Sequence, residues 1–180
     1  MVVQRVSIAV VGAILLWSAG MLMAPRAAIA QAANLTDPRP VPPINMEQLG
    51  GGTVELADFS GNVVVLNLFA TWCAPCRHEM PSLDRLQAKV ADQPITVIAL
   101  SIDRVGADRI QAWMDDLGVQ HLTTLHDRTM QAAQALGAPG LPATYIIDGR
   151  GMERARVFGV EEWDADGIVQ MLTALVSETG

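Results

Sequence analysis

The chain has 180 residues, of which 51% are hydrophobic, and it carries 12 basic and 19 acidic side chains. Residues 1–30 contain only Arg5 and Arg26 as charged side chains, so the remainder keeps ten basic and all nineteen acidic side chains, a net charge of −9. This acidic balance argues against nucleic acid as a partner. A remainder of about 150 residues can bury the core of one domain without a structural disulfide.

An uncharged segment follows the first arginine. Val6–Ala24 contains no charged residue, Pro25 ends the run, and Ala28-Ile29-Ala30 has the small-x-small form of a signal-peptidase site. We therefore expect the protein to be exported, with residues 1–30 acting either as a cleaved signal peptide or as an N-terminal membrane anchor. A run of 19 residues is just long enough to span a bilayer, so both alternatives remain open.

The next stretch, residues 31–43, is rich in proline, with four prolines within Pro38–Pro43. Proline lacks a backbone N–H group and favours extended polyproline geometry. The stretch is therefore predicted to be a semi-rigid spacer that does not enter the interior of a sheet. The domain itself is predicted to cover residues 44–180.

The first part of this domain predicts a strand followed by a helix. Val54–Ala57 is expected to be a short edge strand, and the almost continuous apolar run Val63–Phe69 is expected to be a strand that is buried on both faces. The apolar residues that follow have spacings of three and four, which places them on one side of a helix: Met80, Leu83, Leu86 and Val90.

The rest of the domain continues this alternation. Ile95–Leu100 is a predicted buried strand, and Ile110–Leu117 has apolar residues at helical spacing before Gly118. The later predicted elements are a helix over Met130–Leu136, a strand over Thr144–Ile147, a turn at Asp148-Gly149, a strand over Arg154–Phe158 and a helix over Asp164–Val176. This order predicts an α/β fold, with a central mixed sheet flanked by helices on both faces.

Both cysteines of the chain lie in Trp72-Cys73-Ala74-Pro75-Cys76, where the predicted buried strand gives way to the helix. Unpaired N–H groups and the dipole at a helix start favour a negative charge, which lowers the pKa of a thiol. We therefore predict that Cys73 is the nucleophile and that Cys76, one turn later, resolves the mixed disulfide. The pair predicts a thiol-disulfide oxidoreductase with a redox-active Cys73–Cys76 disulfide.

Two other interpretations of the cysteine pair are weaker. A pair of buried, inert cysteines is at odds with the oxidising compartment that an exported protein meets. A closed zinc site needs four ligands, whereas the histidines are scattered at His78, His121 and His126. We expect no metal site and no cofactor.

Spacing alone does not decide the roles of two further residues. Glu79 lies three residues after Cys76, where a buried carboxyl group could take the proton of the resolving thiol, but spacing by itself favours a solvated glutamate on the helix surface. Pro142 comes just before the strand Thr144–Ile147, and the general frequency of cis X–Pro bonds favours a trans bond there.

Two separated segments carry a family resemblance. Val64–Pro81, which contains the cysteine pair, and Gly140–Asp148 resemble the two signatures of the TlpA, ResA and CcmG group of membrane-tethered thioredoxin-like proteins. The resemblance implies a thioredoxin-like fold over residues 44–178.

The resemblance also assigns roles to single residues. Pro142 corresponds to the family's cis-proline, which faces the dithiol, and the backbone of Leu141 would bind an extended substrate segment. Together with Trp72, these residues form the expected substrate-binding site. Glu79 matches the acidic residue that the group keeps beside its cysteines, which favours a proton-handling role, and Asn67 stands where ordinary thioredoxins carry a buried aspartate.

By the same resemblance, the protein would reduce protein disulfides in the periplasm or its equivalent, with electrons relayed by a membrane thiol transporter. Candidate substrates are the haem-attachment cysteines of apocytochrome c and copper-site assembly proteins. Gly137–Gly140 only partly matches the insert of CcmG proteins, which favours a TlpA-like or ResA-like member. Two alternatives stay open: a disulfide oxidase, because sequence does not fix the redox potential, and a module that binds Cu(I) through Cys73 and Cys76.

Overall fold

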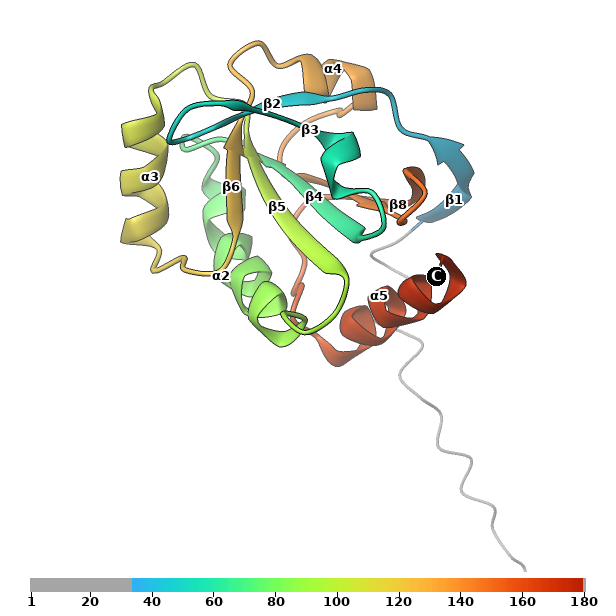
Figure 1. The fold of residues 1–180 in the computed structure, drawn as a ribbon. Helices are drawn as coiled ribbons and strands as arrows, with labels where there is room; N and C mark the ends of the chain where they lie inside the picture. Colours follow the sequence, from blue (N-terminus) through green and yellow to red (C-terminus); the bar gives the residue numbers. More distant parts are fainter. Residues whose placement is uncertain (1–33, 180) are drawn as a thin grey trace, which may run out of the picture.

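The computed structural model describes residues 34–179, and within them eight strands form one mixed sheet (Figure 1). The strands are β1 (Asn34–Pro40), β2 (Asn45–Gln48), β3 (Thr53–Glu55), β4 (Val63–Phe69), β5 (Ile95–Ser101), β6 (Thr123–His126), β7 (Ala143–Ile147) and β8 (Met152–Phe158). Their order across the sheet is β1-β8-β7-β4-β5-β6-β2-β3, which puts β4 near the middle. The predicted signal peptide or anchor over residues 1–30 lies outside the described residues.

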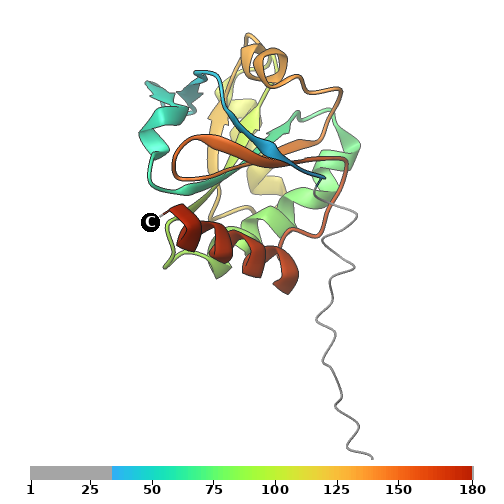
Figure 2. The same cartoon turned by 90° about the vertical axis from the view of Figure 1, so that its right-hand side faces the viewer.

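Helices cover both faces of the sheet. They are α2 (Ala74–Lys89), α3 (Ala107–Asp116), α4 (Gln131–Leu136) and α5 (Asp166–Thr179). Figure 2 shows α2 and α5 on one side of the sheet and α4 on the other. Alternate residues of a strand point to opposite faces, so Val65 of β4 joins the core beneath α2, α3 and α5, whereas Leu66 joins the core beneath α4. None of the helices between residues 34 and 179 has the length and apolar character needed to cross a membrane.

The central strand β4 positions the cysteine loop. All seven of its residues are buried, and it pairs in parallel with β5 and antiparallel with β7. Its carboxyl end leads into the loop that carries the cysteines, and Leu68 lies opposite Ala143, the first residue of β7. Pro142, which comes immediately before β7, is therefore brought beside the cysteine loop.

Part of the proline-rich stretch, Asn34–Pro40, forms a strand instead of the predicted spacer. β1 pairs antiparallel with β8, with Pro40 opposite Met152, and forms the outer edge of the sheet. Proline is tolerated in an edge strand because its missing N–H group can face away from the ladder. The buried carboxylate of Glu153 also accepts a hydrogen bond from Nε of Arg39 at 2.8 Å. The prediction of a spacer is therefore wrong for Asn34–Pro40, which belong to the sheet.

Other differences concern short elements. The edge strand expected at Val54–Ala57 ends at Glu55, and a short 3-10 helix, η1 (Leu56–Phe59), follows it. The sequence pattern does not reveal β2 and β6, because each has only four residues and too few buried positions to show a period. These strands extend the sheet beyond β5. The remaining predicted strands and helices agree with the structure to within about three residues at their ends.

Candidate active site

The two cysteines lie at the start of α2 and are joined by a disulfide bond, with their Cα atoms 5.3 Å apart. Cys73 is the N-cap residue of the helix, and its Sγ accepts a hydrogen bond from the backbone N–H of Cys76 at 3.2 Å. Cys73 is 5% exposed, whereas Cys76 is fully buried. Both residues are thus largely buried, and Cys73 is the one that keeps some exposed surface, which is the order that the predicted roles require.

A buried aspartate that sequence reasoning missed holds the loop before the cysteines. Asp103, just after β5, accepts hydrogen bonds from the backbone N–H of Thr71 at 2.7 Å and from Oγ of Ser101 at 3.1 Å. His126, at the end of β6, donates from Nε2 to the carbonyl oxygen of Asp103 at 2.8 Å. The signal that could have found this cluster is topological, because β4, β5 and β6 run in parallel and their carboxyl ends meet.

Glu79 is buried, with 1% of its surface exposed. Nδ2 of Asn67 donates to its Oε1 at 2.7 Å, and Nε1 of Trp163 donates to its Oε2 at 3.1 Å. Burial raises the pKa of Glu79 from 4.5 to about 7, because desolvation of the carboxylate outweighs these hydrogen bonds. The surface position that spacing alone favours is therefore wrong, while the proton-handling role stays a prediction.

Two side chains from distant parts of the sequence thus surround this carboxyl group. Asn67, on β4, also donates from Nδ2 to Oγ1 of Thr144 on β7 at 2.9 Å. Its Oδ1 is buried and has no hydrogen-bond partner among the described residues. Trp163 lies in the connection between β8 and α5, and sequence reasoning missed it because no local pattern relates it to Glu79, 84 positions earlier.

The Leu141–Pro142 peptide bond is cis. This corrects the expectation of a trans bond from general frequency and confirms the conformation that the family resemblance implies. The carbonyl oxygen of Pro142 accepts a hydrogen bond from the backbone N–H of Gly159 at 3.0 Å. Gly159 has a φ of 105°, which other residues rarely adopt, so a glycine is needed where the chain leaves β8 to reach this carbonyl.

An apolar groove of about 510 Å³ opens beside Cys73. Trp72, which is 72% exposed, and Leu141 both line it, whereas Pro142 is not among its lining residues. The lining contains no charged side chain: Trp72, Cys73, Ala74, Pro75, Ile102, Met130, Ala133, Ala138, Pro139, Gly140 and Leu141. Met130 has a left-handed backbone with φ 58°, an uncommon and costly conformation for a residue with a side chain. The structure therefore places two of the three predicted substrate-binding residues on one groove.

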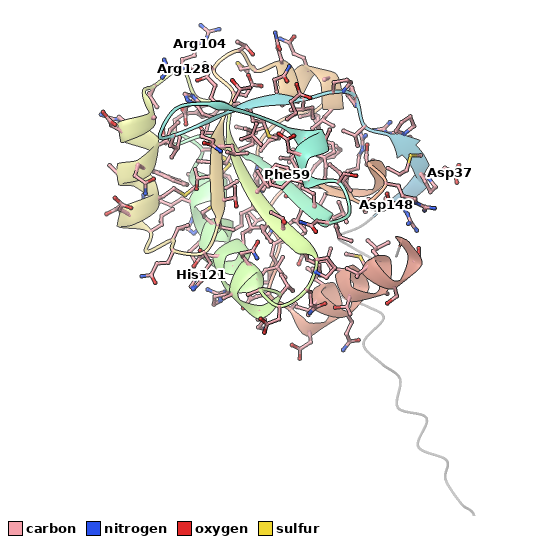
Figure 3. All side chains as sticks on the ribbon, viewed as in Figure 1. Asp37, Phe59, Arg104, His121, Arg128 and Asp148 are labelled. Carbon is pink, nitrogen blue, oxygen red and sulfur yellow. A yellow bond between two sulfur atoms is a disulfide. The ribbon has the colours of Figure 1, made fainter. Side chains whose placement is uncertain are left out.

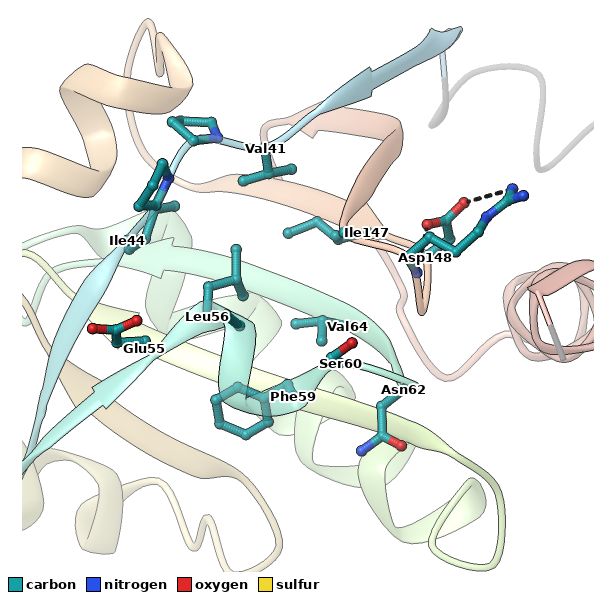
Figure 4. A pocket seen from close by; sticks show the side chains of 15 residues that line it. Val41, Ile44, Glu55, Leu56, Phe59, Ser60, Asn62, Val64, Ile147 and Asp148 are labelled. Atoms are coloured by element: carbon teal, nitrogen blue, oxygen red, sulfur yellow. Dashed lines mark hydrogen bonds and ion pairs between the residues drawn. The ribbon is translucent and has the colours of Figure 1, made fainter.

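A second cavity, of about 390 Å³, lies at the opposite end of β4. Figure 4 shows Val41, Leu56, Val64 and Ile147 converging on it. In Figure 3, Arg104 and Arg128 mark the end of the sheet at which β5 and β6 finish, and Phe59 and Asp148 lie away from that end. This cavity is therefore separated from the cysteines by the length of the central strand.

Within residues 34–179, no group of three or more histidine, cysteine, aspartate and glutamate side chains is placed to hold a metal ion. His78 and His121 are exposed, whereas His126 is buried against Asp103. Among the described residues, no histidine, aspartate or glutamate therefore joins the two cysteine sulfurs in a possible Cu(I) site.

A cysteine pair at a helix start, a cis-proline ahead of the neighbouring strand and a mixed sheet between helices define a thioredoxin-like protein. The model of the AhpC/TSA family matches residues 38–155, which is more than half of the chain. The chain belongs to this family, and the predicted thioredoxin-like α/β fold is confirmed.

The chain is similar to several proteins with related names. It is 35% identical over 124 residues to the thiol:disulfide interchange protein DsbE of Yersinia pestis, a match that covers 67% of this chain and 63% of that protein. It is 30% identical over 105 residues to the thiol-disulfide oxidoreductase ResA of Oceanobacillus iheyensis, covering 58% of this chain and 54% of that protein. The chain thus spans less than two thirds of the length of these relatives. Since proteins of both names match, the preference for a TlpA-like or ResA-like member stays a prediction.

A solved structure shows the same fold over most of the domain. The crystal structure of a thiol:disulfide interchange protein of the thioredoxin family from Chlorobium tepidum has a TM-score of 0.64 and 25% sequence identity to this chain. The match covers 76% of this chain and 97% of that structure. The fold that carries the cysteine pair therefore has a counterpart in an experimentally determined protein.

Proposed function

We propose that the protein is a thiol-disulfide oxidoreductase that reduces disulfide bonds of exported proteins. The observation that carries this proposal is that Cys73 lines an open groove and Cys76 is not among its lining residues. Cys73 borders an open apolar groove, whereas Cys76 is fully buried one turn further along α2. The names of the relatives, a thiol:disulfide interchange protein and a thiol-disulfide oxidoreductase, support the same class of reaction.

The reaction begins from the reduced pair. The thiolate of Cys73 attacks one sulfur of a substrate disulfide, forms a mixed disulfide and releases the other substrate sulfur as a thiolate. The thiolate of Cys76 then attacks Sγ of Cys73, which forms the disulfide that the structure contains and releases the first substrate sulfur. Two electrons pass from the dithiol to the substrate. A membrane thiol transporter would return the pair to its reduced form.

The start of α2 favours the thiolate of Cys73. The backbone N–H of Cys76 donates to its Sγ, and the unpaired N–H groups of the first helical turn add the positive end of the helix dipole. Both effects stabilise a negative charge on sulfur more than a neutral thiol, so thiolate is available near neutral pH. Cys76 lacks the same exposure, and its proton needs an acceptor inside the protein.

Glu79 is the acceptor that we assign to that proton. It lies one turn after Cys76 on α2, and burial raises its pKa to about 7. A carboxyl group with this pKa is ionised for part of the time at neutral pH and can also hold a proton, as a general base for the resolving step requires. An exposed glutamate of ordinary pKa would be a weaker base.

The groove beside Cys73 is the proposed binding site for the substrate polypeptide. Its uncharged lining and the exposed ring of Trp72 suit apolar side chains next to the target cysteine. Leu141, ahead of the cis peptide bond, would offer its backbone to an extended segment. Recognition through backbone and apolar contacts would accept unfolded chains in which a disulfide is exposed.

The cellular setting follows from the sequence and the family resemblance. The uncharged run Val6–Ala24 supports export, with the segment either cleaved or kept as an anchor. The reductase would then act in the periplasm, on apocytochrome c or on copper-site assembly proteins. In this setting residues 44–180, together with β1, make up the exported domain.

Covalent trapping tests the assigned roles. Cys76→Ser should accumulate a mixed disulfide between Cys73 and its substrates, because the resolving thiol is missing. Cys73→Ser, the matched control, should trap none, since its remaining cysteine is fully buried. Non-reducing electrophoresis and mass spectrometry of the captured proteins would identify the substrates. Equal trapping by the two variants would reject the assignment of nucleophile and resolving thiol.

A redox titration against glutathione or dithiothreitol buffers tests the direction of electron flow. A reductase should have a reduction potential nearer the roughly −270 mV of thioredoxin than the roughly −120 mV of the oxidase DsbA. A potential at the oxidising end would favour the oxidase. Tight one-to-one Cu(I) binding by the reduced protein, without turnover of a model disulfide, would favour the copper module.

A further inference from the structure

We propose that Trp163 is a positioning residue for Glu79, and that its indole N–H holds the carboxyl group in the place from which it exchanges a proton with Cys76. This inference rests on the proposed disulfide-exchange function. It assigns a reaction role to a residue of the connection between β8 and α5, outside both sequence signatures of the site.

Trp163 is attached to the same stretch of α2 that carries Glu79. Although it lies in a connecting segment, only 1% of its surface is exposed. Its backbone N–H donates to Oγ of Ser82 at 3.2 Å, and that hydroxyl group donates to the carbonyl oxygen of Glu79 at 2.8 Å. Its side chain donates to Oε2 of Glu79 at 3.1 Å. The backbone of Trp163 is therefore tied to this helical turn independently of the indole contact.

The carboxyl group of Glu79 is held from two sides. Asn67 of β4 donates to one oxygen and Trp163 donates to the other. Both donors are neutral, so they orient the carboxylate without neutralising its charge. A buried carboxylate depends on such donors, because it has lost its hydration.

The charged and titratable groups around Glu79 are few. The strands contribute the neutral side chains of Asn67 and, through it, Thr144. On α2 the titratable neighbour is Cys76 in the reduced protein. The connection before α5 contributes Glu161, whose backbone N–H group lowers the pKa of Glu79 by hydrogen bonding, while its negative charge has a smaller effect in the opposite direction. No cation is among the groups that affect the pKa of Glu79. Loss of either donor should therefore raise this pKa further, so that Glu79 keeps its proton to higher pH.

The same connection also reaches the other side of the active site. Gly159, at the end of β8, donates to the carbonyl oxygen of Pro142, and Trp163 follows four residues later. One short segment therefore contacts both the cis-proline and the buried carboxyl group. A buried indole N–H needs an acceptor in any case, and here that acceptor is the carboxylate of Glu79, so the indole fixes the position of one of its oxygens.

Nuclear magnetic resonance tests the contact in the unmodified full chain. In the oxidised protein, the indole N–H resonance of Trp163 should shift with pH, with a midpoint near 7, as Glu79 changes charge. The resonance is identified by its loss in Trp163→Phe, and its titration should vanish in Glu79→Gln. A resonance that does not move between about pH 5 and 9, or that still titrates in Glu79→Gln, would overturn the proposal.

Kinetics of the reduced full chain with 5,5′-dithiobis(2-nitrobenzoate) tests the consequence. Attack by Cys73 releases a first coloured thiolate in a concentration-dependent phase, and resolution by Cys76 releases a second in a concentration-independent phase. Trp163→Phe should move the midpoint of the pH dependence of the second phase upward by about one unit, because a hydrogen bond to a charged group is lost. The first phase should be unchanged.

Two controls make the result specific. Trp113→Phe changes a partly buried tryptophan that stacks on Phe69, so it should reproduce any general effect of the substitution without the pH shift. In a Glu79→Gln background, Trp163→Phe should cause no further shift. A wild-type protein without the first phase would reject the proposed function itself. Two normal phases with an unchanged profile in Trp163→Phe would reject only the role of Trp163.

Discussion

Helix α2 buries two carboxyl groups, Glu79 and Asp84, and their surroundings differ in kind. Each oxygen of Glu79 has one neutral side-chain donor, and burial raises its pKa to about 7. Burial also acts to raise the pKa of Asp84, but hydrogen bonds from His121 and from the backbone of residues 120–122 hold it below its ordinary value. The comparison shows that the donors of Glu79 do not offset its desolvation, whereas those of Asp84, which include His121, more than offset it.

The two groups therefore contribute to stability with opposite dependence on pH. The folded-state pKa of Glu79 is raised, so the folded protein holds this proton more tightly; its contribution is present below the ordinary pKa of 4.5 and is lost as pH rises towards 7 and beyond. The pKa of Asp84 is lowered, so its contribution is present above 3.8 and is lost as pH falls through the lowered value. Glu79 belongs to the proposed active site, and Asp84 fixes the loop before β6.

The largest effect is expected from Asp84→Ala. Oδ1 of Asp84 accepts the backbone N–H groups of residues 120–122 at 3.0, 2.7 and 3.2 Å, and the substitution leaves them without this acceptor. We expect a loss of about 3 kcal/mol in the free energy of unfolding at pH 7, measured by urea denaturation. The rate of disulfide exchange by the folded variant should be unchanged, since the cysteine pair and Glu79 are untouched.

Asp84→Asn tests whether the hydrogen-bond acceptor or the negative charge of Asp84 stabilises the loop. Asparagine keeps one carbonyl oxygen for the backbone N–H groups but removes the negative charge. It should lose clearly less stability than Asp84→Ala if the three backbone bonds are what matter. An equal loss in the two variants would show that the negative charge, rather than the hydrogen-bond acceptor, stabilises this loop. Backbone hydrogen bonds would then not explain why Asp84 differs from Glu79.

The second effect concerns the pH dependence of stability. Glu79→Gln removes a carboxyl group that must be charged at alkaline pH while buried. Relative to the wild type, the oxidised variant should gain stability as pH rises from 5 to 8, on the order of 2 kcal/mol over that range. Urea denaturation at several pH values measures this difference. Parallel curves for the two proteins would mean that Glu79 has an ordinary pKa, against the contrast with Asp84.

Local patterns in the sequence predict much of the fold. β4 and β5 are almost continuous apolar runs, and α2 and α3 have apolar residues at helical spacing, so their burial is visible without any tertiary contact. β1 has no such pattern, because its place in the sheet depends on β8 and its prolines indicate a spacer. β2 and β6 are short, and their pairing with each other carries no local signature.

The residues of the proposed site also differ in how far the sequence predicts their arrangement. The cysteine pair and the helix start are adjacent in sequence, and their arrangement follows from local geometry. The environment of Glu79 does not, because Asn67 comes from the central strand and Trp163 from the connection before α5. A pKa near 7 is a property of that assembled environment, so spacing on a helical wheel could not predict it.

The smallest effect is expected from His121→Ala, which removes a single donor from Asp84. Nδ1 of His121 donates to Oδ2 at 2.9 Å, and the half-exposed ring leaves the backbone bonds to Oδ1 in place. We expect a loss of about 1 kcal/mol in the free energy of unfolding at pH 7. His78 is an exposed histidine on α2, and His78→Ala should change the free energy of unfolding by less than about 0.5 kcal/mol. If His121→Ala cost as much as Asp84→Ala, the imidazole rather than the backbone amides would hold the carboxylate. The low pKa of Asp84 would then come from one partner, and its backbone donors would no longer explain the contrast with Glu79.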